Sequence, residues 1–588
     1  MKLISRYKKI YLKGIVLGVG LLATNVLYAQ NDTEVYSEKV IVTSSYQPEL
    51  QVHEKINTSP VITDTSTIKT NFKYSIYPNR IYSLFKPEVI KAARLVGEPT
   101  TKLYGSYFRL GMGTYMSPLA DVYINSKRSE TLNYTARVYH NSSWWSLEDY
   151  GDNHFSNTTV DLFGKRMWKD KVLSANLFYH NNYHLYYGFT DSTWSRVYPE
   201  TERTDLKNSD YSQVYNYFGA NVDFRKTTLT DKLYYYAAMD FTNLSDHYGS
   251  NELYFGAIGD IRYGFTLFGN DREHLGLKLS FDIYGNDKDT LYPYSFVGLT
   301  NDSLLSFRTN ILKVNPYIMF KMYGFDVNFG VNVVSSSDAE VLFFPRILLS
   351  QNFFDGLLCL KAGVFGDVYR NTWQSLRTEN PYIAPGVDIE NMVYSKFYLN
   401  ADLSVANNLD IGLGLTYQTM ENAPLFMIDT MYRLHNVYKP IYEDYSVFQI
   451  GANASYKFNE KFEFGFSANY YDYKLDTDAE IEKILYKPNY DLNIHTSYWY
   501  NDKIKVALNA VILGKMQGLN IDENGALAYE EMDMRYGIDL KAEYRHTNAL
   551  SFFAMFDNVA FQRYFYWTNY PSQKFRFMVG LTYTLPTL

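Results

Sequence analysis

Strict alternation of apolar and polar residues is the feature that most limits how this chain can fold. It runs from about Leu103 to Leu585 in segments of roughly ten residues, the length that a tilted β-strand needs to cross a bilayer. Six segments show it most clearly. One parity of these segments holds only apolar or aromatic side chains: Leu275, Leu277, Leu279, Phe281, Ile283; Phe325, Val327, Phe329, Val331, Val333; Leu409, Ile411, Leu413, Leu415, Tyr417; Phe462, Phe464, Phe466, Ala468, Tyr470; Ile504, Val506, Leu508, Ala510, Ile512; and Phe575, Phe577, Val579, Leu581, Tyr583, Leu585.

The charged residues of the same segments all fall in the opposite parity. They are Lys278, Asp282, Asp326, Asp410, Glu463, Lys505 and Arg576. A Lys or Arg that faces lipid at mid-bilayer costs about 2–4 kcal/mol, so this sorting is expected when one face meets lipid and the other a wet lumen. A soluble sandwich also alternates, with its apolar faces packed on one another, and is the less favoured alternative. The pattern predicts an all-β fold, a transmembrane antiparallel β-barrel.

The connections between segments alternate in length. Tight turns are predicted at 168–171, 322–324, 354–356, 407–408, 459–461, 501–503 and 547–548. Longer polar loops are predicted at 141–155, 187–213, 285–302, 370–390, 419–445 and 472–488. Short turns at one end and long loops at the other are typical of outer-membrane barrels, which have an even number of strands. We therefore predict about 22 strands over residues 103–588, within a range of roughly 18 to 22.

The N-terminal part of the chain differs from the rest. Basic residues between positions 2 and 13 precede an apolar run over 15–22 and the small residue Ala29, which predicts a signal peptide over residues 1–29. Residues 30–102 contain several prolines and few alternating runs, and we expect a small periplasmic extension or a reduced plug there. No later window offers the roughly 20 uncharged apolar residues that a transmembrane helix needs, so membrane insertion would depend on strands.

Composition excludes some classes of protein. The 58 Tyr and 38 Phe suit a barrel, which needs aromatic girdles at two membrane interfaces. A single cysteine, Cys359, excludes an internal disulfide framework. The net charge of -7 gives no reason to expect nucleic acid as a partner.

The last hairpins carry a family resemblance. A strand over 536–545, a short turn and a strand over 550–558 are followed by an aromatic stretch and a final strand over 575–585. This order resembles the barrel end of TonB-dependent outer-membrane receptors. The residues that match the family's motif are Asn558, Tyr564, Trp567, Phe577, Gly580 and Tyr583. Leu585 departs from the family, which usually ends on an aromatic residue.

The hexamer over 38–43 is similar to the segment at which receptor plugs begin, near the site that the TonB protein pulls. The resemblance implies that Val40, Ile41, Val42 and Thr43 contact TonB by strand addition, which needs extended, β-branched residues. A full plug needs about 100 residues or more, so a complete plug is not expected in residues 30–102. The N-terminal region, inward-folded loops or a partner protein must then close so wide a barrel.

Metal sites are weaker candidates. Asn520, Asp522, Asn524 and Glu531 fall at positions 1, 3, 5 and 12 of a calcium loop, with Gly525 at position 6. The first position departs from the usual Asp, no helices flank the stretch, and a turn at a loop tip fits it equally well. Four carboxylates over 476–482 favour a solvated acidic loop over a divalent-ion site. His180 and His184 lie about 13 Å apart on an extended strand, too far to hold one metal ion.

Other residues have structural readings that outweigh functional ones. The aromatic residues Trp144, Trp145, Tyr186 and Tyr187 are expected in a membrane girdle rather than in a sugar-binding site. No G-x-S-x-G elbow, H-E-x-x-H motif, phosphate-binding glycine loop or C-x-x-C pair occurs, so we do not expect an enzyme.

Two functions follow from these expectations. The resemblance implies an integral outer-membrane protein that takes up a nutrient across that membrane. The alternative is a non-transporting barrel that serves as a subunit or scaffold of an outer-membrane assembly or secretion complex, and the short N-terminal region is its main argument. The expected partners are membrane lipid, lipopolysaccharide and the barrel assembly machinery, with TonB or other envelope proteins implied by the two readings.

Overall fold

The computed structural model describes residues 104–126, 129–147, 150–190, 211–228, 232–266, 273–288, 307–337, 339–406, 408–430, 434–459, 461–521 and 526–586. The predicted signal peptide over 1–29, the extension over 30–102 and the TonB contact at Val40, Ile41, Val42 and Thr43 lie outside these residues. Within the described ranges, no helix has the length and apolar character required to cross a membrane.

In the described part of the chain, twenty-two antiparallel strands form one closed sheet, which confirms the predicted fold class and strand number. Each strand pairs with its neighbour along the chain, and β1 pairs with β26 to close the ring. Two small hairpins, β20–β21 and β24–β25, lie outside it. The elements are β1 (Tyr104–Gly113), β2 (Ser117–Asn125), β3 (Leu132–Ser146), β4 (Asp152–Met167), β5 (Lys171–Leu185), β6 (Ser212–Lys226), β7 (Leu233–Asp246), β8 (Ser250–Phe265), β9 (Glu273–Lys288), β10 (Phe307–Met322), β11 (Phe325–Ser336), β12 (Ala339–Phe353), η3 (Phe354–Gly356), β13 (Leu358–Tyr369), α4 (Trp373–Glu379), β14 (Met392–Ala406), β15 (Leu409–Ile428), β16 (Tyr438–Phe458), β17 (Phe462–Leu475), β18 (Tyr490–Tyr500), β19 (Ile504–Leu513), β20 (Met516–Ile521), β21 (Leu527–Met532), β22 (Arg535–Arg545), β23 (Leu550–Asp557), β24 (Phe565–Trp567), β25 (Tyr570–Pro571) and β26 (Arg576–Pro586).

Apolar and polar side chains lie on opposite faces of the sheet, as the alternation predicted. Apolar side chains of the outward parity are exposed on the barrel's outer surface, as Leu275 and Leu413 illustrate at 58% and 57%. A soluble protein rarely exposes so long an apolar belt, which is expected where lipid covers it. The opposite parity faces the lumen, where Asp282 of β9 forms an ion pair with Arg370 at 2.9 Å. The soluble sandwich is thereby excluded, because the sheet closes on itself with its apolar side outward.

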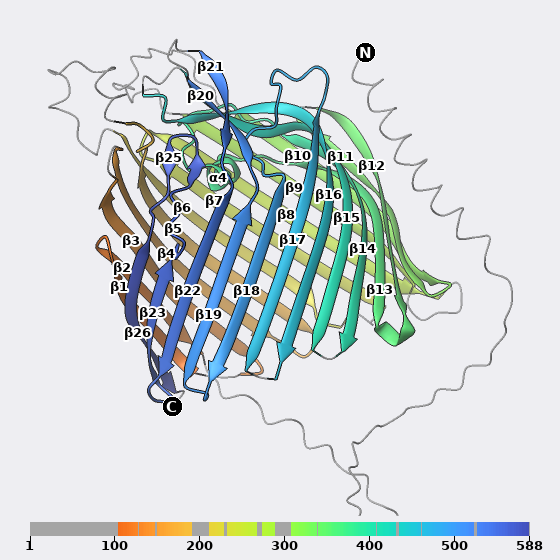
Figure 1. Ribbon diagram of the computed structural model, residues 1–588. Helices are drawn as coiled ribbons and strands as arrows, with labels where there is room; N and C mark the ends of the chain where they lie inside the picture. The colour runs from red at the N-terminus through yellow and green to blue at the C-terminus, as the bar shows by residue number, and fades with distance from the viewer. Residues whose placement is uncertain are drawn as a thin grey trace, which may run out of the picture. The chain divides into compact units, whose positions relative to one another are not determined.

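The connections differ between the two ends, as Figure 1 shows. Tight turns lie at the end where β26 finishes, and in the β10–β11 turn Tyr323 and Gly324 adopt φ angles of 50° and 84°. The long connections, with α4, β20, β21 and β25, gather at the opposite end, which we take as the external one.

Two predicted loops are shorter than expected because their strands continue into them. β3 and β4 pair as far as Ser146 and Asp152, inside the predicted loop over 141–155. β15 and β16 pair as far as Ile428 and Tyr438, inside the predicted loop over 419–445. The alternation fails there because both faces of the extended hairpin are covered: Leu425 and Ile428 are fully buried.

The seam between β1 and β26 is tightly packed around one glycine. Gly580 faces the lumen, pairs with Gly111 of β1 and with Phe553 of β23, and lies under the Phe553 ring. A Cβ on Gly580 would stand 2.2 Å from the Leu110 carbonyl oxygen and 2.4 Å from the Phe553 ring. A side chain at this position would therefore force the closing strands apart.

We expect Gly580→Val to destabilise closure of the barrel by about 1–3 kcal/mol, because an overpacked side chain must displace backbone as well as a ring. The measurement is urea unfolding of the refolded protein in lipid vesicles, followed by heat-modifiable migration on a gel. Gly537→Val is the matched control, because Gly537 also faces the lumen and nothing lies within 4 Å of its added Cβ. Equal midpoints for both variants would contradict this account of the seam.

Candidate functional site: a loop cap across the external mouth

The external connections bury a large apolar cluster of their own. Its members come from the connections β3–β4, β5–β6, β13–β14, β15–β16, β17–β18, β19–β22 and β23–β26 and from strand ends near them. We call this assembly the cap. Its buried residues are Leu147, Tyr187, Tyr215, Leu244, Tyr284, Trp373, Leu376, Ile383, Ile389, Phe426, Ile428, Tyr438, Leu485, Tyr486, Met516, Leu519, Met532, Trp567 and Tyr570.

The cap joins opposite sides of the barrel. Asn436, between β15 and β16, donates its side-chain amide to the carbonyl oxygen of Tyr186, just after β5, at 2.6 Å. β16 stands eleven strands from β5 in the ring of 22, so this bond connects loops that start on opposite walls. The Tyr186 hydroxyl in turn donates to the Ile383 carbonyl oxygen between β13 and β14, at 2.9 Å. Within the described residues, the external mouth is therefore spanned by inward-folded loops.

Tyr570 of β25 lies at the centre of these contacts. Its ring stacks on Tyr382 with a centroid separation of 3.5 Å and meets Tyr187 edge-on at 4.9 Å. Its hydroxyl donates to the Asn436 carbonyl oxygen. The ring fits because residue 188 is glycine, where a Cβ would stand 2.5 Å from the Tyr570 ring. Burial raises the pKa of Tyr570 well above its ordinary value, so this hydroxyl stays protonated and able to donate at neutral pH.

The helix α4 fixes the β13–β14 connection to the barrel wall. Thr372 and Ser375 form a capping box at its start, and Trp373 is fully buried. The Glu252 carboxylate of β8 accepts bonds from the Gln374 backbone N–H at 3.1 Å and from the Tyr284 hydroxyl at 2.9 Å. A carboxylate at a helix start is favourable because the first backbone N–H groups have no partner within the helix.

Arg370, just before α4, connects the cap to the lumen. Its guanidinium forms the ion pair with Asp282 and lies over the Tyr254 ring at 3.6 Å from the centroid. The side chains of Arg370, Asp282 and Tyr254 are polar groups that a solute in the lumen would meet directly below the cap. The cap is thus continuous with the charged inner wall of β8 and β9.

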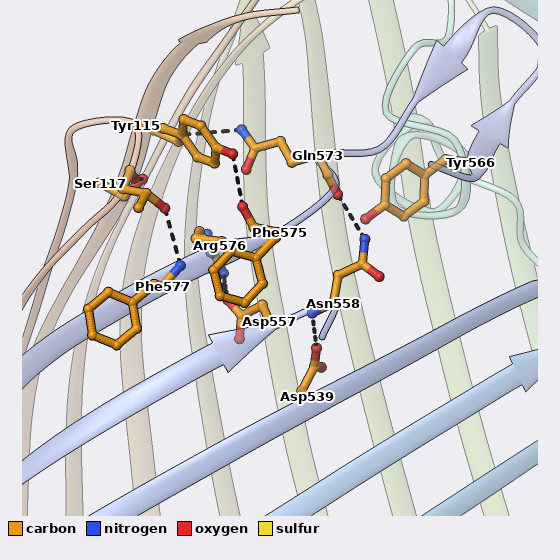
Figure 2. Close-up of polar contacts among 12 residues, drawn as sticks. Tyr115, Ser117, Asp539, Asp557, Asn558, Tyr566, Gln573, Phe575, Arg576 and Phe577 are labelled. Atoms are coloured by element: carbon orange, nitrogen blue, oxygen red, sulfur yellow. Dashed lines mark hydrogen bonds and ion pairs between the residues drawn. The ribbon is translucent and has the colours of Figure 1, made fainter. Parts of the chain in front are cut away.

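The C-terminal motif residues anchor one loop of the cap. Asn558 follows β23 with a φ of 53°, and its side-chain amide donates to the Gln562 and Gln573 carbonyl oxygens at 2.8 and 3.1 Å. Its backbone N–H donates to Asp539 of β22 at 2.9 Å, as Figure 2 shows. Arg576 pairs with Asp557 at 2.6 Å across the base of the same loop. Asn558 therefore closes the loop over 558–575 that carries Tyr570 into the cap.

The structure separates the six motif residues into two groups. Tyr564 and Trp567 lie in the loop that Asn558 closes, and the Trp567 ring is buried against Tyr486 at 4.6 Å. The remaining three lie on β26, where Phe577 packs on Phe556, Gly580 lies under Phe553 and Tyr583 is 40% exposed on the outer face.

The predicted calcium loop is partly described. Asn520 lies in β20 and donates to Glu530 at 2.9 Å, while Glu531 of β21 pairs with Lys515 at 2.5 Å. Asp522 and Asn524 lie outside the described residues, so the calcium site stays a prediction. No group of three or more potential ligands with metal-holding geometry occurs among the residues that the structure describes.

The prediction for the loop aromatics was wrong at two of four positions. Tyr186 and Tyr187 are each only 3% exposed and belong inside the cap rather than to a membrane girdle. Trp144 is exposed at 55%, and Trp145 stacks on Tyr115 at 3.8 Å. Sequence reasoning also missed Trp373 and Tyr382, and it placed Tyr570 in the C-terminal aromatic stretch without giving it a role in a buried layer. The one available signal was the density of tyrosine in connections too long for simple turns.

Comparison with known proteins identifies the fold. No model of a known protein family matches the sequence, and no curated protein matches it. Several solved structures, however, match the structure of this chain. The ferric-catecholate import receptor Fiu of E. coli K12 has a TM-score of 0.62 at 10% identity, over 82% of this chain and 82% of that chain. The pyoverdine outer membrane receptor FpvA of Pseudomonas aeruginosa PAO1 has a TM-score of 0.58 at 13% identity, over 83% and 79%.

A ferric enterobactin receptor, PfeA of Pseudomonas aeruginosa, gives a similar result, with a TM-score of 0.59 at 12% identity over 83% of this chain and 82% of that chain. Each of these three proteins is a receptor. The described chain has their barrel fold, the fold of TonB-dependent receptors, as the C-terminal resemblance implied. With its apolar outer belt, it is an integral outer-membrane barrel.

We expect Tyr570→Ala to loosen the cap and leave the barrel folded. Loss of a fully buried aromatic ring removes about 3 kcal/mol, which corresponds to roughly 100-fold faster amide hydrogen exchange in the cap loops if they open together. The measurement is hydrogen exchange followed by mass spectrometry over the peptides that contain Tyr187, Tyr382 and Asn436. Tyr323→Ala is the control, because Tyr323 is 90% exposed in a turn at the other end. Unchanged protection in those three peptides would show that Tyr570 does not hold the cap.

Proposed function

We propose that this chain, whose barrel has the fold of TonB-dependent receptors, takes up a nutrient across the outer membrane. One observation carries the proposal. A barrel of receptor fold encloses a charged, water-facing wall, and that wall lies directly beneath a cap built from external loops. A barrel that only filled the membrane would need neither a polar lumen of this width nor an elaborate external cap. No enzymatic role is proposed.

The cap has the properties of a gate that a solute could open. Its loops are held together by bonds from tyrosine hydroxyls to backbone carbonyl oxygens, such as that from Tyr187 to Pro571 at 3.0 Å and that from Tyr438 to Thr568 at 2.7 Å. A bound solute could replace these hydrogen bonds with hydrogen bonds of its own, because a hydroxyl can donate or accept and a carbonyl oxygen can accept from many kinds of donor. The similar receptors take ferric-catecholate, pyoverdine and enterobactin, so ferric siderophores are the first class to test.

Energy for cap opening would come from TonB, which we place at Val40, Ile41, Val42 and Thr43 on the sequence resemblance alone. Membrane lipid, lipopolysaccharide and the barrel assembly machinery complete the proposed set of partners. We also propose that calcium bound by Asn520, Asp522, Asn524 and Glu531 would stabilise the β20–β21 hairpin.

A second function is favoured by the packing of the cap. Trp373, Tyr438 and Tyr570 are buried as completely as the core of a soluble domain. Breaking such a core costs several kcal/mol, and a barrel held shut this firmly suits a subunit or scaffold of an envelope assembly or secretion complex. The two functions differ in whether the cap ever opens.

Uptake by a strain that lacks its own copy of the protein distinguishes them. We expect the wild-type chain to restore uptake of ⁵⁵Fe supplied as its enterobactin or pyoverdine chelate. The triple variant Val40→Pro, Ile41→Pro and Val42→Pro should lower uptake to the level of the deletion strain, because proline removes the N–H groups that strand addition needs.

The matched control is Val61→Pro with Ile62→Pro, which places prolines in another β-branched pair of the same region. Barrel content in the membrane is checked for each variant by heat-modifiable migration. Wild-type protein that supports no uptake and co-purifies stoichiometrically with other envelope proteins would favour the scaffold and overturn the transport proposal.

A further inference from the structure

A second feature of the lumen is a cavity in the wall formed by β6 to β12. It measures about 460 Å³ and lies toward the periplasmic end, well below the cap. Its walls are side chains of the lumen parity on successive strands. Four of them are cationic, namely Arg225 of β6, Arg262 of β8, Lys278 of β9 and Arg346 of β12.

Among the described residues that line the cavity, one is a carboxylate, and it already has partners. Asp260 accepts a bond from the Tyr317 hydroxyl at 2.6 Å and pairs with the Arg262 guanidinium at 3.2 Å. Arg262 also lies over the Tyr234 ring at 4.2 Å. Arg262 is thus neutralised and held in place, which leaves Asp260 with little capacity for a second cation.

The other three cations have no such partner among the residues whose structure is described. Arg225, Lys278 and Arg346 form no ion pair with any residue that the structure describes, whereas the lumen cations Arg109, Arg137 and Lys313 all do. The Arg346 Nε is buried and has no hydrogen-bond partner. A buried guanidinium donor without an acceptor is costly, and an oxyanion would satisfy it.

The neighbouring cavity shows that this imbalance is local. A second cavity of about 280 Å³ lies higher on the same wall and shares Ile258, Lys278, Asn315 and Arg346 with the first. Besides the shared Lys278 and Arg346, its lining has one cation, Lys313, and three carboxylates, Asp240, Asp282 and Asp367. Two of these carboxylates are paired, Asp367 with Lys313 at 2.8 Å and Asp282 with Arg370. A solute that moves down this wall from the cap therefore passes from a stretch lined by three carboxylates to one lined by a single carboxylate.

We propose that the lower cavity is a binding site for an oxyanion-bearing solute, with Arg225, Lys278 and Arg346 as the binding side chains. The low-dielectric wall of a barrel focuses into the lumen the field of these three cations, which form no ion pair in the described part of the chain, and this field attracts a multiply charged anion and not a neutral solute. The volume accommodates a small phosphate ester or polycarboxylate. Binding does not depend on transport, but the role of the bound anion as cargo rests on the proposed uptake function.

Binding is measured on the full-length protein in detergent by titration calorimetry at low salt, with inorganic pyrophosphate as the probe and glucose as the neutral comparison. We expect pyrophosphate to bind, more weakly as salt is raised, and glucose not to bind. Arg346→Gln together with Lys278→Gln should weaken pyrophosphate binding by roughly ten-fold or more, as expected when charge-assisted hydrogen bonds are removed.

Lys505→Gln is the matched control. Lys505 belongs to the lumen parity of β19, ten strands from β9 in the ring, and forms no part of the cavity. An equal loss of binding in Lys505→Gln would mean that the whole lumen attracts anions without a site. Full binding by the double variant, or no binding by the wild type, would overturn the proposal directly.

A measurement on the unmodified chain removes any dependence on how the variants fold. Pyrophosphate should protect Lys278, and not Lys505, from acetylation by an amine-reactive reagent, as read by mass spectrometry. Equal labelling of Lys278 with and without pyrophosphate would refute the site. Neither measurement involves uptake. If the protein binds the anion and transports nothing, the transport function is refuted and the binding site is retained.

Discussion

Closure of the sheet is the constraint on which every other feature depends. In hydrocarbon an unpaired backbone N–H or carbonyl group costs several kcal/mol, so a spanning sheet cannot have an edge. The first and last strands meet this requirement through the register that places Gly111 opposite Gly580. The aromatic ring of Phe553 covers that glycine pair from the lumen and fills the space where two side chains are missing. The packing of these two glycines at the seam between β1 and β26 thus determines whether the barrel can close.

The cap follows a different principle, because it lies in water and cannot rely on lipid. Its core uses tyrosine where a soluble core would use leucine. A tyrosine ring contributes a large apolar area, and its hydroxyl can satisfy a carbonyl group of an irregular loop that would otherwise be buried without a partner. Tyr186, Tyr187 and Tyr438 each do both. This dual use explains how long connections with little regular structure pack into one ordered layer.

The fold could be predicted from the sequence and the cap could not. Alternation with period two, seen in runs such as 275–283, identifies lipid-facing strands because the membrane imposes the same rule on each strand separately. The cap depends on pairs such as Asn436 with Tyr186, which lie 250 residues apart and follow no period. Tyr186 and Tyr187 were therefore expected in a girdle. The motif residue Asn558 was found by resemblance, but its role in closing a loop depends on hydrogen bonds to Gln562 and Gln573 that follow no sequence pattern. The proposed TonB segment at Val40 to Thr43 still depends on the sequence alone.

The central position of Tyr570 has a mechanical consequence. One ring touches side chains or backbone from three other connections, so the loops cannot leave the mouth one at a time without first releasing it. The loops are therefore expected to open together in one step and not one after another. The same contacts link opposite walls of the barrel at its external mouth and resist flattening of the barrel there. An external ligand or an internal pull that dislodged this one residue would act on the entire aperture at once.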